Sequence, residues 1–390
     1  MIISLGLIIL LGLSLNAIML KIKIPSLIAY VITGIVLGPY VLDLINPDLL
    51  NISQDLRKIA LIVILLRAGL TLDIKDLKIV GKGAILLSVL PATIEIISIG
   101  FLSMWLLEFT LIEGLILGSI VAAVSPAVVV PRMIDLINKK RGTEKSIPQM
   151  VLSGSSIDDI YSIVLFTIFL QIYETNTITA VSILAFPISI ILGVLFGIIM
   201  GIILVKLFKK FHMRDTVKVL IIFGIAFLFD YVDSSLKDFI PFSSLLAVIT
   251  LGITILQKYP VLSERLTHKF SKIWVFSEMI LFVLIGALVN IYIIPTIGIN
   301  FVILLVLALI VRFLSVYFST SGINLNFKER LFVYFSYLPK ATVQAAIGAI
   351  PLSLGMPAGE VILGISVLSI FLTAPIGAIL IDNTQKYLLG

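Results

Sequence analysis

The sequence has 390 residues, of which 60% are hydrophobic and 13% are charged, and its formal net charge is +6. Soluble domains are about half apolar and a quarter charged, so this composition excludes a soluble globular protein. The sequence contains no cysteine and only two histidines, which excludes a disulfide framework and argues against a Cys/His metal site. Its basic residues lie in short breaks beside apolar runs, so they indicate membrane orientation and no nucleic-acid partner.

Apolar runs of about 18 residues or more, each long enough to cross a ~30 Å hydrocarbon core, follow one another from Ile2 to Ile381. The first run has no basic leader and is interpreted as a retained span. We predict an all-α polytopic membrane protein with about thirteen transmembrane helices and no soluble domain. The predicted spans are centred near Ile9, Ile35, Val63, Ile94, Ile120, Ile160, Leu195, Gly224, Val248, Leu284, Val306, Ala345 and Leu368.

The breaks after odd-numbered spans are basic, whereas those after even-numbered spans hold acidic residues such as Asp48, Glu108 and Asp230. The positive-inside rule therefore places the N-terminus outside and the C-terminus in the cytoplasm of a cell (plasma or inner) membrane. The basic breaks include Lys75 and Lys78 after span three, Lys139, Lys140 and Arg141 after span five, Lys209 and Lys210 after span seven, and Arg265 and Lys269 after span nine.

Two spans at corresponding positions of the sequence are interrupted by proline. An extra leading span would leave two five-span halves of opposite topology, which is the arrangement of an inverted repeat. The fourth span of each half contains Val124-Ser125-Pro126 or Leu338-Pro339-Lys340, with Pro131 and Pro351 further on. Proline removes a helix hydrogen bond and clashes with the preceding turn, so both spans are predicted to be broken near mid-membrane, where helix ends can hold ions. Ordinary proline kinks are the alternative.

Two adjacent aspartates, Asp158 and Asp159, lie well inside span six. A charge at the centre of a membrane helix costs about 2.5 to 3.5 kcal/mol on insertion scales, so each needs a partner or a function. Consecutive helical residues differ by about 100° in direction, so one aspartate can face a water-filled cavity while the other reaches a neighbouring helix. Burial and repulsion favour a protonated carboxyl group and a nearby cation favours an ionised one, so proton and cation can compete. The alternative is a pair of helix-cap aspartates.

Three further charges lie deep in apolar runs. Glu95 in span four and Arg312 in span eleven occupy the same position in the two halves, which favours a buried, mainly structural ion pair between them. In the alternative, Arg312 contacts Asp158 and is displaced when ions bind. Lys340 follows Pro339 at the second break, where it could neutralise the carbonyl end of a half-helix or contact Asp158.

Small polar residues complete the candidate ion site. Their oxygens suit sodium, although serine and threonine also satisfy helix packing in membranes. The predicted ion-binding set is Asp159, Asp158, Ser125, Ser155 and Thr342, with Ser156 and Gln344 as further candidates. In span seven, Gly193, Gly197 and Gly201 form a small-residue ladder, for which packing within the chain is preferred to a subunit contact.

The sequence resembles the cation/proton antiporter superfamily and, within it, the NHA-type sodium/proton exchangers. The motifs are LLRAGL at residues 65–70, AVSPAVVVP at 123–131, SIDD at 156–159 and LPKATVQAAIG at 338–348. The resemblance implies an NhaA-like antiporter fold with inverted five-helix repeats and two crossing broken helices. A dimerisation panel would cover approximately residues 1–75 and 180–258, and an ion-transporting core that moves as an elevator would cover approximately 81–172 and 300–381.

The resemblance also implies residue roles. Asp159 is expected to carry the cation and the proton, with Asp158 as its partner in binding the transported sodium. Glu95 and Arg312 match the core ion pair of the family, and Lys340 matches the lysine of its second crossing helix. Such ion pairs occur in electroneutral relatives, whereas two-aspartate sites often accompany electrogenic exchange, so the stoichiometry stays open.

We therefore expect a sodium (or lithium)/proton antiporter that forms a homodimer in the lipid membrane and needs no bound cofactor. A potassium/proton antiporter or an organic-anion carrier of the same fold is the alternative. An intramembrane aspartyl protease is a remote one, because its aspartates would lie on separate helices and the sequence has no Gly-x-Gly-Asp motif. Charged, broken and repeat-related helices favour a carrier over a channel.

Overall fold

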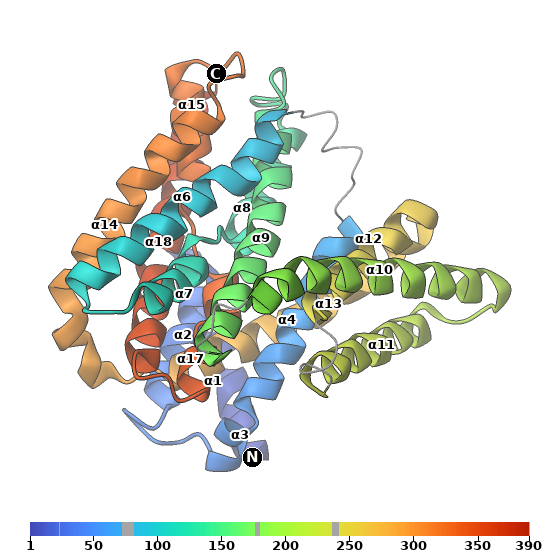
Figure 1. The fold of residues 1–390 in the computed structure, drawn as a ribbon, viewed down its shortest axis with the longest axis horizontal. Helices are drawn as coiled ribbons and strands as arrows, with labels where there is room; N and C mark the ends of the chain where they lie inside the picture. The colour runs from blue at the N-terminus through green and yellow to red at the C-terminus, as the bar shows by residue number, and fades with distance from the viewer. Residues whose placement is uncertain (23, 72–81, 176–179, 236–241, 390) are drawn as a thin grey trace. The chain divides into compact units, whose positions relative to one another are not determined.

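The computed structural model describes residues 1–22, 24–71, 82–175, 180–235 and 242–389 (Figure 1). The regular structure of these residues is helical and contains no β-strand, which confirms the predicted all-α class. The predicted basic break with Lys75 and Lys78 lies outside the described residues.

The helix labels in Figure 1 are numbered in chain order and are given there where space allows. The first part of the chain forms α1 (Ile2–Lys21), α2 (Ser26–Leu37), α3 (Pro47–Asn51), α4 (Ser53–Thr71), α6 (Lys82–Leu106), α7 (Leu111–Ala122), α8 (Pro126–Asn138) and α9 (Ile147–Thr175). The middle forms α10 (Ala180–Lys210), α11 (Asp215–Ser235), α12 (Ser244–Lys258) and α13 (Pro260–Ala287). The last part forms the short 3₁₀ helix η1 (Ile291–Ile293), then α14 (Ile294–Ser319), α15 (Phe327–Ser336), α16 (Thr342–Ile347), α17 (Ile350–Ser353) and α18 (Gly359–Leu388).

The helices agree with the predicted positions of the spans. Each predicted centre lies inside a helix, including Ile120 in α7 and Ala345 in α16. Within the described residues, eight helical stretches are long and apolar enough to cross a membrane, and three shorter apolar helices accompany them. The chain is therefore a multi-pass membrane protein, while the count of thirteen spans and the inverted repeat stay predictions.

Helix α13 is longer than the sequence suggested. The predicted loop around Arg265 and Lys269 is helical, because α13 begins at Pro260 and runs for 28 residues. At 1.5 Å per residue this helix, including the first turns that replace the predicted loop, measures about 42 Å, which is longer than the ~30 Å hydrocarbon core. An apolar stripe at helical spacing explains the extension, because it gives these turns a buried face. The stripe consists of Leu262, Leu266, Phe270 and Trp274.

The contacts within the chain define two compact units. The first unit holds α1, α2, α3, α6, α7, α8 and most of α9, together with the chain from Met279 onward. The second unit holds α10, α11 and α12, with α4 from Lys58 and α13 up to Glu278. The predicted panel and core are a functional division of the chain and stay a prediction.

Two helices of the first unit are interrupted where proline predicted a break. Helix α7 ends at Ala122 and α8 begins at Pro126, which suits the first turn of a helix. Pro131 stays inside α8 and does not end it. Helix α15 ends at Ser336 and α16 begins at Thr342.

Both first halves of these interrupted helices begin with a capping box. Thr110 and Glu113 start α7, and Asn326 and Glu329 start α15. In each pair the side chain of the cap accepts from the backbone N–H three residues on, and the glutamate accepts from the backbone N–H of the cap. The start of each broken helix is therefore fixed by local sequence.

The small-residue ladder of α10 packs against α12 inside the second unit. A Cβ added to Gly197 would lie 2.5 Å from the carbonyl oxygen of Ala247, and one added to Gly193 would lie 2.6 Å from that of Ser243. These distances are too short for a side chain, so the ladder lets the two helix backbones approach closely. Packing within the chain accounts for these glycines.

This close approach predicts a stability difference between two alanine variants. Gly197→Ala should lower the free energy of unfolding by about 1 to 3 kcal/mol, because the methyl group overpacks the α10–α12 contact. Gly224→Ala in α11 is the matched control, since nothing lies within 4 Å of its added Cβ. Thermal unfolding in detergent compares the two. Equal midpoints in both variants would contradict the packing described here.

Candidate functional site

The two interrupted helices meet at their breaks. The backbone N–H of Ser125 donates to the carbonyl oxygen of Pro339 at 2.7 Å, which joins one break to the other. Nε2 of Gln344 in α16 lies within hydrogen-bonding distance of three carbonyl oxygens at the end of α7, those of Ile120 (2.8 Å), Val121 (3.3 Å) and Ala123 (3.0 Å). The last carbonyls of a helix lack partners within it, so Gln344 satisfies groups that would otherwise be buried without one.

Two cationic side chains also donate hydrogen bonds at the end of α7. The carbonyl oxygen of Ala122, the last residue of α7, accepts from Nη1 of Arg312 at 2.6 Å and from Nζ of Lys340 at 3.2 Å. Positive charge is favoured at the C-terminus of a helix because the backbone dipoles leave partial negative charge there. Lys340 thus occupies one of the two places predicted for it, the carbonyl end of a half-helix.

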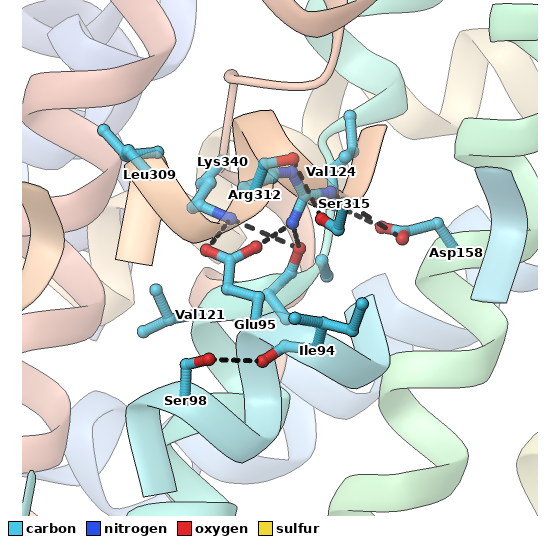
Figure 2. A network of polar contacts seen from close by, with 12 residues as sticks. Ile94, Glu95, Ser98, Val121, Val124, Asp158, Leu309, Arg312, Ser315 and Lys340 are labelled. Carbon is cyan, nitrogen blue, oxygen red and sulfur yellow. Dashed lines mark hydrogen bonds and ion pairs between the residues drawn. The ribbon is translucent and has the colours of Figure 1, made fainter. Parts of the chain in front are cut away.

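Glu95 lies between the same two cations (Figure 2). Its Oε1 lies 2.9 Å from Nζ of Lys340, and its Oε2 accepts from Nη1 of Arg312. All three side chains have no solvent exposure. The expected pairing of Glu95 with Arg312 is present, and the contact with Lys340 is one that sequence reasoning missed.

Arg312 also faces the aspartate pair. Its Nη2 lies 3.7 Å from Oδ1 of Asp158, so the contacts predicted as alternatives for Arg312 occur together. At 3.7 Å this contact is an ion pair without a hydrogen bond. Arg312 therefore contacts both Glu95 and the candidate ion site.

The two aspartates of α9 have different surroundings, as their angular separation predicts. Oδ2 of Asp158 accepts from the backbone N–H of Val124 at 2.8 Å, in the break before α8. Oδ2 of Asp159 lies 3.5 Å from Oγ1 of Thr342, at the outer limit for a hydrogen bond. Both aspartates are buried: Asp158 has no solvent exposure and Asp159 is 8% exposed. They are therefore not helix-cap residues at the end of a span, which was the alternative interpretation.

Several buried oxygens at this site make no hydrogen bond within the described part of the chain, among them Oδ1 of Asp158, Oδ1 of Asp159, Oγ of Ser125 and Oε1 of Gln344. Buried polar atoms normally have hydrogen-bond partners, so these acceptor oxygens point to a ligand that is positively charged or donates hydrogen bonds. The hydroxyl of Ser155, by contrast, donates to Leu152 in its own helix at 3.2 Å. The side chain of Ser156 lies outside the described residues.

Sequence reasoning also missed two buried hydroxyls. Oγ1 of Thr373 in α18 accepts from the backbone N–H of Lys340 at 3.0 Å and so holds the second break. Thr373 ends a buried polar row with Ser366 and Ser369 at helical spacing, a signal that was present in the sequence. The second hydroxyl, that of Ser162, is buried one turn beyond Asp158.

The charges of this site do not cancel. Glu95, Asp158 and Asp159 contribute three negative charges when ionised, and Arg312 and Lys340 contribute two positive charges, which leaves one negative charge in excess. An uncompensated buried charge is costly, so the site favours one monovalent cation or one proton.

Broken helices meeting beside buried carboxylates inside a multi-pass helical protein define an ion-coupled secondary transporter. Residues 6–383 match the model of a family described as sodium/hydrogen exchanger, transmembrane. The chain belongs to the sodium/hydrogen exchanger family and to the cation/proton antiporters. It is accordingly a transporter and no enzyme, which removes the protease alternative.

Similar proteins agree with this assignment. The chain is 32% identical over 376 residues to sodium/hydrogen exchanger 9B2 of Homo sapiens, which covers 92% of this chain and 68% of that protein. It is 31% identical over 340 residues to human sodium/hydrogen exchanger 9B1, covering 84% and 65%. The fold matches the sodium proton antiporter MjNhaP1 of Methanocaldococcus jannaschii with a TM-score of 0.86 at 22% identity, over 100% of this chain and 98% of that one.

The buried charge cluster predicts non-additive stability effects. Glu95→Gln and Arg312→Gln should each lower the free energy of unfolding by about 3 to 5 kcal/mol, because each removes one side of a buried ion pair. Glu95→Gln takes from Lys340 the carboxylate that contacts it, and Arg312→Gln raises the excess negative charge of the site from one to two. The double variant keeps the same excess of one negative charge as the wild type and should lose less than the sum of the two.

Thermal unfolding midpoints of the purified proteins measure this coupling. Asp135→Asn is the control, because it breaks an exposed i,i+4 pair with Lys139 and should have little effect. Strictly additive losses would show that Glu95 and Arg312 do not stabilise one another.

Proposed function

We propose that this chain is a secondary active sodium (or lithium)/proton antiporter in which cation and proton compete for the pair Asp158 and Asp159. The observation that carries the proposal is the excess of one buried negative charge beside carboxylate oxygens without hydrogen-bond partners in the described residues. Family membership supports sodium and proton as the substrates, and the local geometry supports the choice of these residues.

Cation binding uses oxygens at the meeting of the two breaks. Oδ1 of Asp159, Oδ1 of Asp158 and Oγ of Ser125 are buried oxygens of the kind that replace water around a small hard cation. Thr342 lies beside Asp159, and Ser155 lies one turn before it on α9. We assign Asp159 as the principal ligand because, unlike Asp158, it has no cation in contact among the described residues.

Coupling follows from electrostatics. A sodium ion and a proton each neutralise the excess charge, and binding both would leave the buried site positive. The site therefore exchanges one cation for another and does not carry both together. A site with excess negative charge also disfavours the organic-anion alternative.

Alternating access is proposed to occur by an elevator movement. Each residue of the site lies in the first unit, where α6, α7, α8, α9, α14 and α16 are joined by the contacts described above. Such a cluster can move as one body within the proposed core, approximately residues 81–172 and 300–381. The proposed panel, approximately 1–75 and 180–258, would form a homodimer in the cell membrane, with the N-terminus outside and the C-terminus in the cytoplasm.

Proteoliposomes test the function. Sodium added to vesicles with an imposed pH gradient should dissipate that gradient with the wild type and not with Asp159→Asn, which removes the charge and keeps the shape. Asp135→Asn is the control for loss of a carboxylate at an exposed position. Lithium and potassium added in parallel define selectivity, and valinomycin with potassium shows whether exchange moves net charge.

The proposal fails if the wild type responds to none of the three cations. It also fails in its assignment of the site if Asp159→Asn exchanges sodium at the wild-type rate.

A further inference from the structure

A buried tyrosine beside the charge cluster has no part in the exchange described so far. Tyr337 follows α15 at the second break and has no solvent exposure. Its ring centroid lies 5.7 Å from Cζ of Arg312, within the range of a cation–π interaction. Its backbone N–H donates to the carbonyl oxygens of Val333 at 3.1 Å and Tyr334 at 2.9 Å, so the end of α15 fixes its main chain.

A glycine on the neighbouring helix admits the hydroxyl of this tyrosine. Gly154 lies in α9, one turn before Asp158, and a Cβ added to it would overlap Oη of Tyr337. Residues four apart share a face of a helix, so the hydroxyl approaches α9 on the face that carries Asp158. The ring can therefore hold its position only where residue 154 has no side chain.

The three nitrogens of the Arg312 guanidinium differ in their hydrogen bonding. Its Nη1 is bound by Glu95 and by the carbonyl oxygen of Ala122. Its Nε and Nη2 make no hydrogen bond within the described part of the chain, although Nη2 is directed at Asp158 across 3.7 Å. The ring of Tyr337 is thus a contact that can keep the guanidinium close to Asp158.

We propose that Tyr337 is a positioning residue for exchange: its ring holds Arg312 beside Asp158 when sodium is absent and so raises the sodium concentration needed to load the site. This inference rests on the proposed function. Arg312 and sodium both neutralise Asp158, so whatever stabilises Arg312 there opposes sodium binding and assists sodium release.

Removing the ring tests this role. Tyr337→Leu should lower the apparent KM for sodium by about fivefold, the factor expected for loss of one cation–π contact, and should lower the maximal rate as well because sodium leaves more slowly. General damage to the fold would lower the maximal rate without tightening sodium binding. Tyr231→Leu is the control, because Tyr231 is exposed on α11.

The fit between Tyr337 and Gly154 gives a second, independent test. Gly154→Ala should displace the hydroxyl, and the ring with it, and should change KM and maximal rate in the same direction as Tyr337→Leu. Tyr337→Phe keeps the ring and lacks the hydroxyl, so adding it to Gly154→Ala should restore both values. Gly224→Ala is the control for an alanine in a helix with open space.

Initial rates of sodium-dependent proton movement in proteoliposomes give KM and maximal rate for each variant. An unchanged or raised KM in Tyr337→Leu overturns the inference, as does a Gly154→Ala effect that persists with Tyr337→Phe. If the wild type exchanges sodium and Asp159→Asn does not, such results overturn the role of Tyr337 alone. Absence of exchange in the wild type overturns the proposed function and this inference with it.

Discussion

The end of α7 inside the apolar interior is the constraint on which the site depends. A helix that stops in the middle of a membrane leaves its last carbonyl oxygens without water and without intrahelical partners. Gln344, Arg312 and Lys340 supply the missing donors from other helices. Two of these donors are cations, and burying them in turn requires the carboxylate of Glu95. The break therefore generates the charge cluster.

The aspartates extend this cluster on the other side of Arg312. Asp158 is held by the backbone N–H of Val124 and by the nearby guanidinium, whereas Asp159 has the hydroxyl of Thr342 beside it. The two cations that stabilise the end of α7 therefore balance only two of the three buried carboxylates. In the proposed mechanism, structure and transport share one set of charges, and for this reason a stabilising residue such as Arg312 is also suited to respond to ion binding.

Much of this arrangement could be predicted from the sequence, because breaks and deep charges leave local signals. Pro126 and Pro339 predicted the interruptions, and Glu95 and Arg312 stood out as charges in apolar runs. What could not be predicted depends on contacts between distant segments. Nothing local shows that Lys340 contacts Glu95 or that Gln344 covers the end of α7. The dependence of Tyr337 on a glycine at position 154 likewise emerges only from the packing of two helices.

The competition of sodium and proton for one buried charge is the central claim, and sodium binding to the purified protein as a function of pH tests it most directly. Isothermal titration at several pH values gives the apparent Kd. If one proton competes with one sodium ion, the Kd should rise by about tenfold for each unit of pH below the range in which the site is deprotonated. A sodium Kd that stays constant across the pH range would contradict the account, because cation and proton would then occupy independent sites.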